Sequence, residues 1–348
     1  IKEKLMKNLL VAQSGGPSAA INATITGVID AGIESGRVGH VYGALNGIKG
    51  VLNENFVNLD EVCDTKEKRD LLAITPAAAL GSCRWKLGDP KENAEEFEEI
   101  IRILRKNDIG YFIYTGGNDS MDTVYKLSVY CEEHNIDDIK VMGAPKTIDN
   151  DLGETDHCPG FGSAAKFIAT AFTEIACDCF VYDVPSVTIV EVMGRNAGHI
   201  ALWCGMATGA EDILIPESFD GNLPKVEQQI IEHLLRNRAK GKTHHMVINA
   251  EGVGHSYSMA KRIESATGIE TRATILGHMQ RGGSPTAKDR VYASMMGAYA
   301  VDLLCAGKTN RVVGYQNGRF MDMDIDEGLA MTKDIDEYQL QIAHLLGK

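Results

Sequence analysis

Residues 8–34 read NLLVAQSGGPSAAINATITGVIDAGIE, and this stretch decides the fold. Asn8–Gln13 is a short and almost wholly apolar run, which is typical of a strand buried on both faces. The turn Ser14–Ser18 follows it, and Ala19–Glu34 then repeats its apolar residues with the period of a helix. A strand, a glycine turn and a helix in this order begin a βαβ unit, so the stretch predicts a parallel sheet covered by helices.

The same alternation of short apolar runs and helical segments continues along the whole chain. Strands are expected at Asn8–Gln13, Gly110–Thr115, Lys140–Ala144, Ser186–Val192, Asp212–Ile215, His245–Ala250 and Thr271–Gly277. Helices are expected at Ala19–Glu34, Ala94–Asn107, Met121–Glu133, Ser163–Cys177, Pro224–Arg238, Met259–Ser265 and Lys288–Leu304. The predicted class is therefore α/β with mostly parallel sheets. In such sheets ligands bind beyond the C-terminal ends of the strands, which is where the polar motifs of this chain occur.

The composition limits the classes of function. A chain of 348 residues is long for one hydrophobic core and suits two α/β domains. Its 35 Lys and Arg against 48 Asp and Glu give a formal charge of −13, which argues against non-specific binding to nucleic acid or anionic lipid. No window of about 18 uncharged apolar residues predicts a membrane span. Eight scattered cysteines without a CxxC pair indicate reduced thiols in a cytoplasm.

Two glycine turns follow expected strands. The first is Ser14–Ser18 (SGGPS) and the second is Thr115–Ser120 (TGGNDS). Glycines let backbone amides approach an anion closely, and the N-terminus of the next helix adds partial positive charge. Each turn alone is also compatible with a tight connection, and the second with a helix cap of Asn, Asp or Ser. Their occurrence together favours a cleft that binds phosphoryl groups.

A third motif, Pro145–Asp151 (PKTIDND), follows the strand expected at Lys140–Ala144. Two carboxylates two residues apart, beside a Lys and a Thr, are poor material for a core. As chemistry they make sense, because one Asp can accept a proton from an attacking hydroxyl while the other holds Mg²⁺. The structural alternative is a loop rich in Asx turns.

Two further motifs carry arginines at strand ends. In Glu191–Gly198 (EVMGRNAG), Arg195 is placed to clamp a phosphoryl group, and Gly194 permits a close approach to the backbone. The segment 270–283 (ETRATILGHMQRGG) sets Arg272, His278 and Arg281 around one strand and its exit. Three donors, two of them fixed cations, would anchor a sugar-phosphate dianion. Each arginine alone is equally compatible with a surface ion pair.

Together these blocks resemble the phosphofructokinase family, in the family's order, from Leu9 to about Gln316. The strings PKTIDND, EVMGRNAG and ETRATILGHMQRGGSP are long and specific. The resemblance implies two similar three-layer α/β domains with mostly parallel sheets and an active site in the cleft between them. The implied phosphoryl-donor domain is 1–155 plus about 280–335, the fructose 6-phosphate domain is 156–279, and a C-terminal helix at 336–348 packs back.

The resemblance also implies phosphoryl transfer to the 1-hydroxyl of fructose 6-phosphate, with Mg²⁺ as the metal. Asp149 matches the base that takes the hydroxyl proton, and the other implied catalytic residues are Thr147, Asp151, Arg195, Lys146 and Asp119. The implied donor-binding residues are Gly16, Arg84, Gly117, Asn118, Asp119, Ser120 and Lys146. The implied substrate contacts are Thr147, Ile148, Asp149, Met193, Gly194, Arg195, Glu251, Arg272, His278, Met279, Gln280 and Arg281. The implied metal ligands are Asn118, Asp149 and Asp151.

Two positions bear on the phosphoryl donor. ATP-using members resemble GGDGS and PGTIDND at the two donor loops, whereas this chain has GGNDS and PKTIDND. A carboxylate at Asp119 would crowd and repel the α-phosphate of ATP. Lys146 fills the space of a glycine and offers a cation to a compact pyrophosphate. Both substitutions together resemble the pyrophosphate-dependent enzymes.

Other departures concern regulation. Effector-regulated bacterial ATP enzymes carry two arginines on the first helix, where this chain has Thr26 and Asp30. Lys240 and Lys242 do match later effector lysines. Half a site with an added carboxylate should bind a nucleotide poorly, so we expect a non-allosteric enzyme.

Two departures affect the ligand contacts. Asn118 stands where the family usually has a metal-ligating Asp, and an amide is a weaker Mg²⁺ ligand, so the ion is expected to depend on Asp149, Asp151 or Asp119. Ser186 stands where many ATP enzymes have an arginine that reaches the sugar phosphate of the adjacent subunit.

The prediction is a cytoplasmic, Mg²⁺-dependent phosphotransferase of glycolysis or gluconeogenesis. It would convert fructose 6-phosphate and pyrophosphate reversibly into fructose 1,6-bisphosphate and phosphate. We expect a homodimer or homotetramer in which Arg272 reaches a neighbouring active site, with no nucleic-acid or membrane partner. The alternatives are the same enzyme using ATP, a NAD or lipid kinase with a similar donor loop, and a catalytically silent subunit that only binds sugar phosphates.

Overall fold

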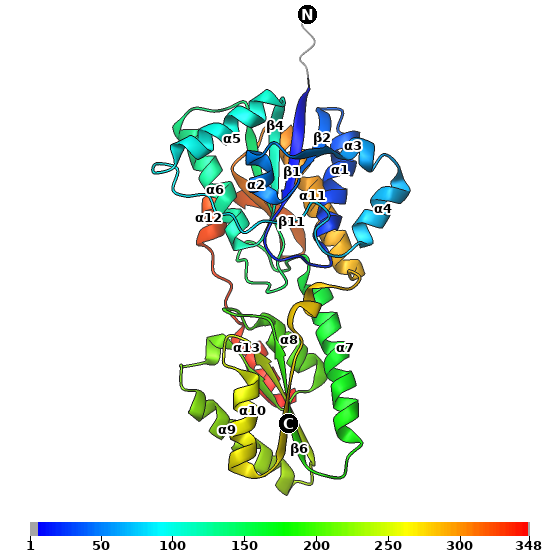
Figure 1. Cartoon of the computed structure of the whole chain (residues 1–348), viewed down its shortest axis with the longest axis vertical. Coiled ribbons are helices and arrows are strands. Elements are labelled where there is room, and N and C mark those ends of the chain that lie inside the picture. The colour runs from blue at the N-terminus through cyan, green and yellow to red at the C-terminus, as the bar shows by residue number, and fades with distance from the viewer. Residues whose placement is uncertain (1–5, 347–348) are drawn as a thin grey trace, which may run out of the picture. The chain divides into compact units, whose positions relative to one another are not determined.

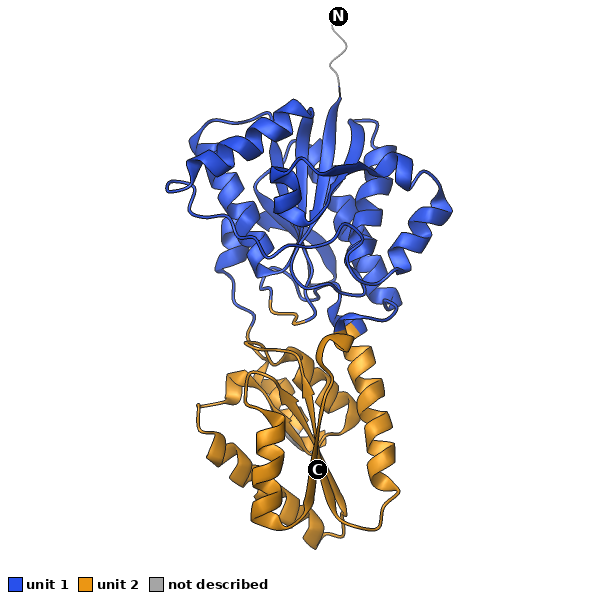
Figure 2. Cartoon of the chain, in the orientation of Figure 1, with its two compact units in different colours: residues 1–148, 152–163, 281–333 blue, residues 149–151, 164–280, 334–348 orange. Residues whose placement is uncertain are grey.

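The computed structural model describes residues 6–346 and divides into two compact units (Figures 1 and 2). Unit 1 takes the residues up to 148, then 152–163 and 281–333, and unit 2 takes 149–151, 164–280 and the residues from 334. The chain therefore passes between the units several times rather than through one linker. The predicted assignment of donor and sugar-phosphate roles to two domains remains a prediction.

Unit 1 is built on a seven-stranded sheet in the order β11-β10-β5-β4-β1-β2-β3. The strands are β1 (Lys7–Gln13), β2 (Val38–Ala44), β3 (Phe56–Asn58), β4 (Ile109–Gly116), β5 (Lys140–Pro145), β10 (Arg311–Gln316) and β11 (Arg319–Asp324). The pairs β2–β3 and β10–β11 are antiparallel and the other pairs are parallel; Val11 of β1, for example, lies opposite Ile113 of β4. The C-terminal ends of β5, β4 and β1 thus lie side by side at one edge.

Helices cover both faces of this sheet. They are α1 (Ile21–Glu34), α2 (Gly47–Leu52), α3 (Leu59–Val62), α4 (Lys66–Ile74), α5 (Ala94–Lys106), α6 (Asn118–Glu133), α11 (Ala287–Cys305) and α12 (Ile325–Ala330). Side chains alternate between the two faces of a strand. Leu9 and Val11 accordingly pack in the core with α1 and α11, while Leu10 and Ala12 pack with α2, α5, α6 and α12. Burial on both faces explains why β1 is apolar throughout.

Unit 2 has an all-parallel, four-stranded sheet in the order β7-β8-β6-β9. Its strands are β6 (Ser186–Val192), β7 (Asp212–Leu214), β8 (His244–Ala250) and β9 (Glu270–Ile275). Its helices are α7 (Phe161–Phe180), α8 (His199–Thr208), α9 (Leu223–Ala239), α10 (Ser256–Thr267) and α13 (Glu337–Leu346), with short 3-10 turns η1 (Pro216–Ser218) and η2 (Gly277–Arg281). α9 and α10 pack on one face, while α8 packs on β7 and β8 and carries α13. The predicted α/β class with mostly parallel sheets is confirmed.

Four strands and one helix start differ from the sequence prediction. β2, β3, β10 and β11 were not predicted. The β10–β11 hairpin turns at Asn317-Gly318, both with positive φ, and an Asn-Gly pair is a strong hairpin signal. Helix α6 begins at Asn118 instead of Met121, with Gly117 as its N-cap, so the predicted donor loop is partly helical.

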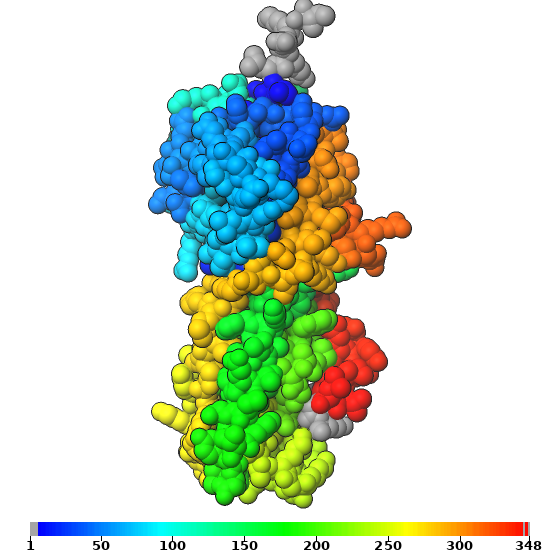
Figure 3. Space-filling view, turned by 90° about the vertical axis from the view of Figure 1, so that its right-hand side faces the viewer, coloured from blue at the N-terminus to red at the C-terminus, as the bar shows by residue number. Residues whose placement is uncertain are grey.

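Two surface properties complete the fold. α7 lies at the surface of unit 2, where its side chains form the green ridge in Figure 3. Beyond its end, Phe180, Val181 and Tyr182 are exposed. Within residues 6–346 we find no helix that combines the length and the apolar character needed to span a membrane. All eight cysteines are free thiols.

Candidate active site

Three loops meet at the C-terminal edge of the unit 1 sheet, where β1, β4 and β5 end. Gly15, in a left-handed conformation with φ +77°, and Gly16 follow β1, Gly117 follows β4, and Lys146 follows β5. We call these four residues the glycine corner. The backbone joins the loops directly, because the Lys146 N–H donates to the Gly116 carbonyl oxygen at 2.8 Å. The two glycine turns predicted from the sequence therefore lie beside each other.

The Lys146 side chain is buried at the centre of the glycine corner. It is 3% exposed, and its ammonium donates a hydrogen bond to the Gly16 carbonyl oxygen. A Cβ atom at Gly15 would lie 3.4 Å from Lys146 Nζ. A buried ammonium is costly unless acceptors or an anion replace its lost water. The corner therefore holds a fixed positive charge against a glycine turn.

A second cation, Arg281, covers the same turn. A Cβ atom at Gly16 would stand 2.8 Å from Arg281 Cζ, so the guanidinium packs directly over this glycine. The sequence assigned Arg281 to the sugar-phosphate contacts, and the structure brings it against a residue assigned to the donor. An arginine here can bind a phosphate in a bidentate manner.

Asn118, Asp119 and Ser120 form the first turn of α6, next to Gly117. Asp119 benefits from this position, because the N-terminus of a helix favours negative charge. Its carboxylate also pairs with Lys86 Nζ at 2.7 Å, although both side chains are about two-thirds exposed, at 66% and 65%. This hydrogen bond raises the pKa of Lys86. The charge of Asp119 is thus partly compensated, which the sequence did not indicate.

Arg84 lies beside this corner on the segment after Gly81. The Ser82 hydroxyl donates to the Gly15 carbonyl oxygen at 2.6 Å, which fastens the segment to the glycine turn. Ser82, Arg84 and Trp85 line a cavity of about 410 Å³, together with Leu45 and other residues. The corner therefore adjoins a space larger than a phosphate.

The two candidate carboxylates lie in the loop after β5. Asp149 and Asp151 are half-buried, and the buried Asn150 between them has a φ of +55°. Asn adopts this left-handed conformation more readily than most residues, and such conformations cluster at functional sites. Thr147 bridges to Gly160, and Ile148 is 5% exposed, so the Ile148 side chain belongs to the core.

In unit 2, three strand ends meet in the same way. The Glu251 N–H donates to the Val192 carbonyl oxygen at 2.9 Å, and a Cβ atom at Gly252 would lie 2.0 Å from the Arg195 carbonyl oxygen. The loops after β6 and β8 are therefore tightly packed side by side. Arg195 and Glu251 both have exposed side chains, and we call this pair with His278 the unit 2 rim.

The segment after β9 completes the rim. Gln280 is 1% exposed; its Oε1 accepts from the Met193 N–H at 3.0 Å, and its Nε2 donates to the Gly277 carbonyl oxygen at 2.9 Å. Its side chain holds the loops together. His278 and Met279 are exposed on the η2 turn. Gly194 has a φ of +126°, which requires a glycine.

Arg272 is not part of the rim. It lies in the middle of the edge strand β9 and pairs with Glu270 at 2.7 Å, with both side chains about half exposed. That hydrogen bond raises the pKa of Arg272. Ser186, where an arginine was noted as missing, bonds to His244 Nδ1 at 2.9 Å.

The sequence missed several residues that hold the glycine corner. Gln13 Nε2 donates to Asn22 Oδ1 at 2.8 Å, and the two amide oxygens accept the N–H groups of Leu80 and Ala79 at 2.8 and 2.9 Å. Two fully buried amides thus fasten the segment that leads to Ser82. The available signal was a polar residue at each place where an apolar pattern expects none. Among residues 6–346 no group of three or more His, Cys, Asp or Glu side chains is placed to hold a metal ion.

Comparison with known proteins gives the following matches. The sequence model of a family described as "Phosphofructokinase" matches residues 8–304. An "ATP-dependent 6-phosphofructokinase" of Clostridium botulinum strain Hall is 39% identical over 345 residues, 99% of this chain and 100% of that protein. The solved pyrophosphate-dependent phosphofructokinase of Marinobacter aquaeolei has a TM-score of 0.84 at 32% identity, covering 96% of this chain and 86% of that one. That of Nitrosospira multiformis has a TM-score of 0.84 at 30% identity, covering 95% and 86%.

Proposed function

The chain belongs to the phosphofructokinase family, and we propose that it transfers a phosphoryl group reversibly from pyrophosphate to the 1-hydroxyl of fructose 6-phosphate. The products are fructose 1,6-bisphosphate and phosphate. The observation that carries the choice of donor is the buried ammonium of Lys146 against the Gly15–Gly16 turn. A compact diphosphate on the glycine amides would compensate that charge.

Asp119 supports a short donor in a second way. Its carboxylate occupies the first turn of α6, where the helix would otherwise attract a further phosphate group. A nucleoside triphosphate that extends along this turn would meet a like charge. The ion pair with Lys86 weakens this repulsion, since it compensates part of the charge. We therefore assign the larger share of donor choice to Lys146.

The reaction uses residues of this chain in defined roles. Asp149 accepts the proton of the 1-hydroxyl as its oxygen attacks phosphorus. The bond from that phosphorus to the bridging oxygen breaks, and phosphate leaves with the electron pair. Lys146 and Arg281 stabilise the charge on the transferred and leaving oxygens, while Arg195 and Glu251 orient the sugar phosphate. Positioning and charge stabilisation account for most of the catalysis of phosphoryl transfer.

Mg²⁺ fits the donor set of the loop after β5. Asp149 and Asp151 are half-buried carboxylates two residues apart, and this ion prefers oxygen ligands, with one or two carboxylates completed by phosphate oxygens and water. Asn118, an exposed amide in the first turn of α6, is the weaker candidate. When bound, the ion neutralises part of the phosphate charge.

ATP is the second candidate donor, and one feature favours it. The cavity of about 410 Å³ beside Ser82, lined by Arg84 and Trp85, has the volume to take a nucleoside. The 39% identical relative also carries an ATP-dependent name. A catalytically silent subunit is the third candidate, which any turnover by the isolated chain would exclude.

The oligomeric state and cell compartment complete the proposal. Exposed Phe180, Val181 and Tyr182 at the end of α7 are suited to an interface between copies of the chain, and Tyr182 lies close enough to Arg272 to affect its charge state. We infer a homo-oligomer in which Arg272 serves a neighbouring site. The eight free thiols agree with a reducing cytoplasm.

The direct test supplies purified protein with fructose 6-phosphate and Mg²⁺, and with pyrophosphate or ATP in parallel. We expect fructose 1,6-bisphosphate to form with pyrophosphate, and pyrophosphate to form again from fructose 1,6-bisphosphate and phosphate. A chelator should stop both directions. Turnover with ATP alone would reject the donor assignment, and no turnover with either donor would favour the silent subunit.

A further inference from the structure

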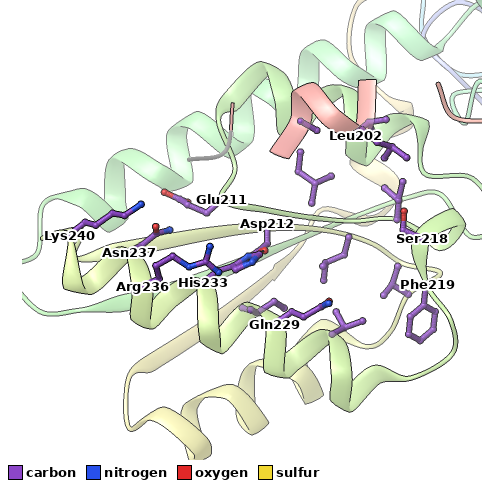
Figure 4. A pocket seen from close by; sticks show the side chains of 18 residues that line it. Leu202, Glu211, Asp212, Ser218, Phe219, Gln229, His233, Arg236, Asn237 and Lys240 are labelled. Carbon is purple, nitrogen blue, oxygen red and sulfur yellow. The ribbon is translucent and has the colours of Figure 1, made fainter. Parts of the chain in front are cut away.

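Unit 2 contains a cavity of about 560 Å³ that the proposed reaction does not use (Figure 4). It is lined mainly by the edge strand β7, the helix α9 and the C-terminal helix α13. None of the residues predicted for catalysis, donor or sugar-phosphate binding lines it. Its volume is in the range of sites for small organic molecules.

The cavity follows from the short edge of the sheet. β7 has three residues and pairs only with β8, so its outer side lacks a neighbouring strand. Ile213 and Leu214 remain half-buried there, and α13 adds Leu340 and the small Ala343. Phe219 continues this wall at the end of the cavity away from Lys240 (Figure 4). One part of the cavity is therefore apolar and incompletely covered.

The acidic groups at the other end are already compensated by this chain. Asp212 accepts hydrogen bonds from His233 Nδ1 at 2.6 Å and from His245 Nε2 at 2.7 Å. Glu211 accepts the Met246 N–H at 2.8 Å and lies 3.4 Å from Lys242 Nζ. Neither carboxylate needs a cationic ligand.

The basic groups at that end are not compensated. Arg236 and Lys240 stand four residues apart on α9, so they are neighbours on one side of the helix. Within residues 6–346, neither side chain makes an ion pair or a hydrogen bond. Figure 4 shows both beside Asn237, whose amide adds a donor. The polar end of the cavity thus has two cations without a partner.

We propose that this cavity binds a small organic anion with an apolar body. A carboxylate or sulfonate head pairs with Arg236 and Asn237, and the body covers the half-buried wall of Leu214, Phe219 and Leu340. The apolar wall distinguishes this ligand from a nucleotide held by Lys242 at the rim. Binding here is independent of the phosphoryl donor, so its test does not depend on the proposed reaction.

The test uses two fluorescent probes that differ in charge. 8-Anilinonaphthalene-1-sulfonate is anionic, and N-phenyl-1-naphthylamine has the same ring system without the sulfonate. Each is titrated into the folded, full-length protein. We expect one saturable site per chain for the anionic probe. Arg236→Gln should weaken it about tenfold, as expected for a lost charge-assisted hydrogen bond, and leave the neutral probe unchanged.

Matched variants locate the site. Leu340→Trp fills the cavity and should weaken both probes, while Leu345→Trp, on an exposed position of the same helix, should weaken neither. Val226→Phe serves as a second filling variant if circular dichroism shows that Leu340→Trp does not fold. Lys242→Gln should leave binding unchanged.

Three results would overturn the proposal. The first is no saturable binding at one probe per chain. The second is binding that neither Arg236→Gln nor the filling variants weaken. The third is a loss in Lys242→Gln as large as that in Arg236→Gln, since it would place the anion at the rim beyond the cavity.

Discussion

The glycine corner of unit 1 and the unit 2 rim both lie at the C-terminal ends of parallel strands, yet they are built differently. In the glycine corner the cation is 3% exposed and bonded to backbone, and Arg281 packs over Gly16. In the rim, Arg195, Glu251 and His278 have exposed side chains on loops held by backbone contacts and Gln280. The corner is fixed before a ligand arrives, whereas the rim presents mobile side chains.

This difference indicates a division of labour. Groups that are fixed in advance stabilise developing charge without reorganising, so changes in the corner should act on the chemical step. Exposed side chains lose freedom on binding, so changes in the rim should act mainly on substrate affinity. The following variants test that contrast, beginning with the loop that follows β5.

The largest effect is expected for Asp149→Asn, which removes the proposed base. We expect kcat to fall by about 10³ to 10⁴, the upper range for a positioned proton acceptor, while fructose 6-phosphate still binds. A coupled assay gives kcat, and calorimetry gives the affinity. A decrease of less than tenfold would show that another group takes the proton.

Lys146→Met tests the glycine corner with a side chain of similar length. The kcat/KM for pyrophosphate should fall by about 10² to 10³, the size of a lost preorganised donor, because the buried charge is absent. KM for fructose 6-phosphate should stay nearly constant, and Tm should not fall. An equal loss with both substrates would mean that the corner does not act on the donor alone.

Arg195→Gln tests the rim. KM for fructose 6-phosphate should rise by about tenfold or more, as for a lost charge-assisted contact to phosphate, with a smaller change in kcat. Because the side chain is exposed, the urea midpoint should stay unchanged. A fall in kcat with an unchanged KM would reject the proposed contrast between corner and rim.

Asp212→Asn tests a buried charge cluster of unit 2 that lies outside both sites. Burial alone would raise the pKa of Asp212, but hydrogen bonds from His233 and His245 outweigh it and lower the pKa. The hydrogen bond to Asp212 raises the pKa of His233. We expect a loss of about 1–3 kcal/mol in the free energy of unfolding, typical of a broken buried hydrogen bond.

The pH dependence of that loss follows from the two directions. The stabilisation from His233 is present below its unfolded pKa of about 6.5 and disappears as pH rises through its raised folded pKa. The stabilisation from Asp212 is present above about 3.9 and disappears as pH falls through its lowered folded pKa. Urea unfolding should therefore show a larger difference at pH 5.5 than at pH 9. A difference that grows at pH 9 would contradict this account.

The smallest effect is expected for Lys86→Gln, which breaks an exposed ion pair with Asp119. Such pairs add little to stability, so the urea midpoint should be unchanged within error. The charge of Asp119 becomes uncompensated, and use of ATP relative to pyrophosphate should fall further. An increase in ATP use would show that Asp119 does not oppose the longer donor.

The sequence predicted those parts of the molecule whose signals are local. The strand and turn at residues 8–18 and the seven expected strands are apolar runs ended by polar loops, and all seven are present in the structure. β2 was missed because glycines and a histidine interrupt its pattern, and β11 because its alternation ends in acidic residues. The Asn317-Gly318 turn was a usable signal for the hairpin.

The candidate site was predictable in part for the same reason. Lys146 and the glycine turns come directly after strands, so sheet geometry brings them together. Arg281 over Gly16, and Lys86 on Asp119, join residues that are distant in the sequence through side-chain packing that no periodic pattern encodes. Such contacts had to come from the structure.

The central claim is that Lys146, with Asp119, sets pyrophosphate as the donor. Its most direct test is the ratio of kcat/KM for pyrophosphate to that for ATP, measured in the unchanged protein and in the double variant Asp119→Gly/Lys146→Gly, with folding checked by circular dichroism. We predict a ratio well above one that falls by at least about tenfold in the variant, as for a lost charge-assisted contact. A ratio below one in the unchanged protein, or a ratio that the variant leaves the same, would contradict the claim.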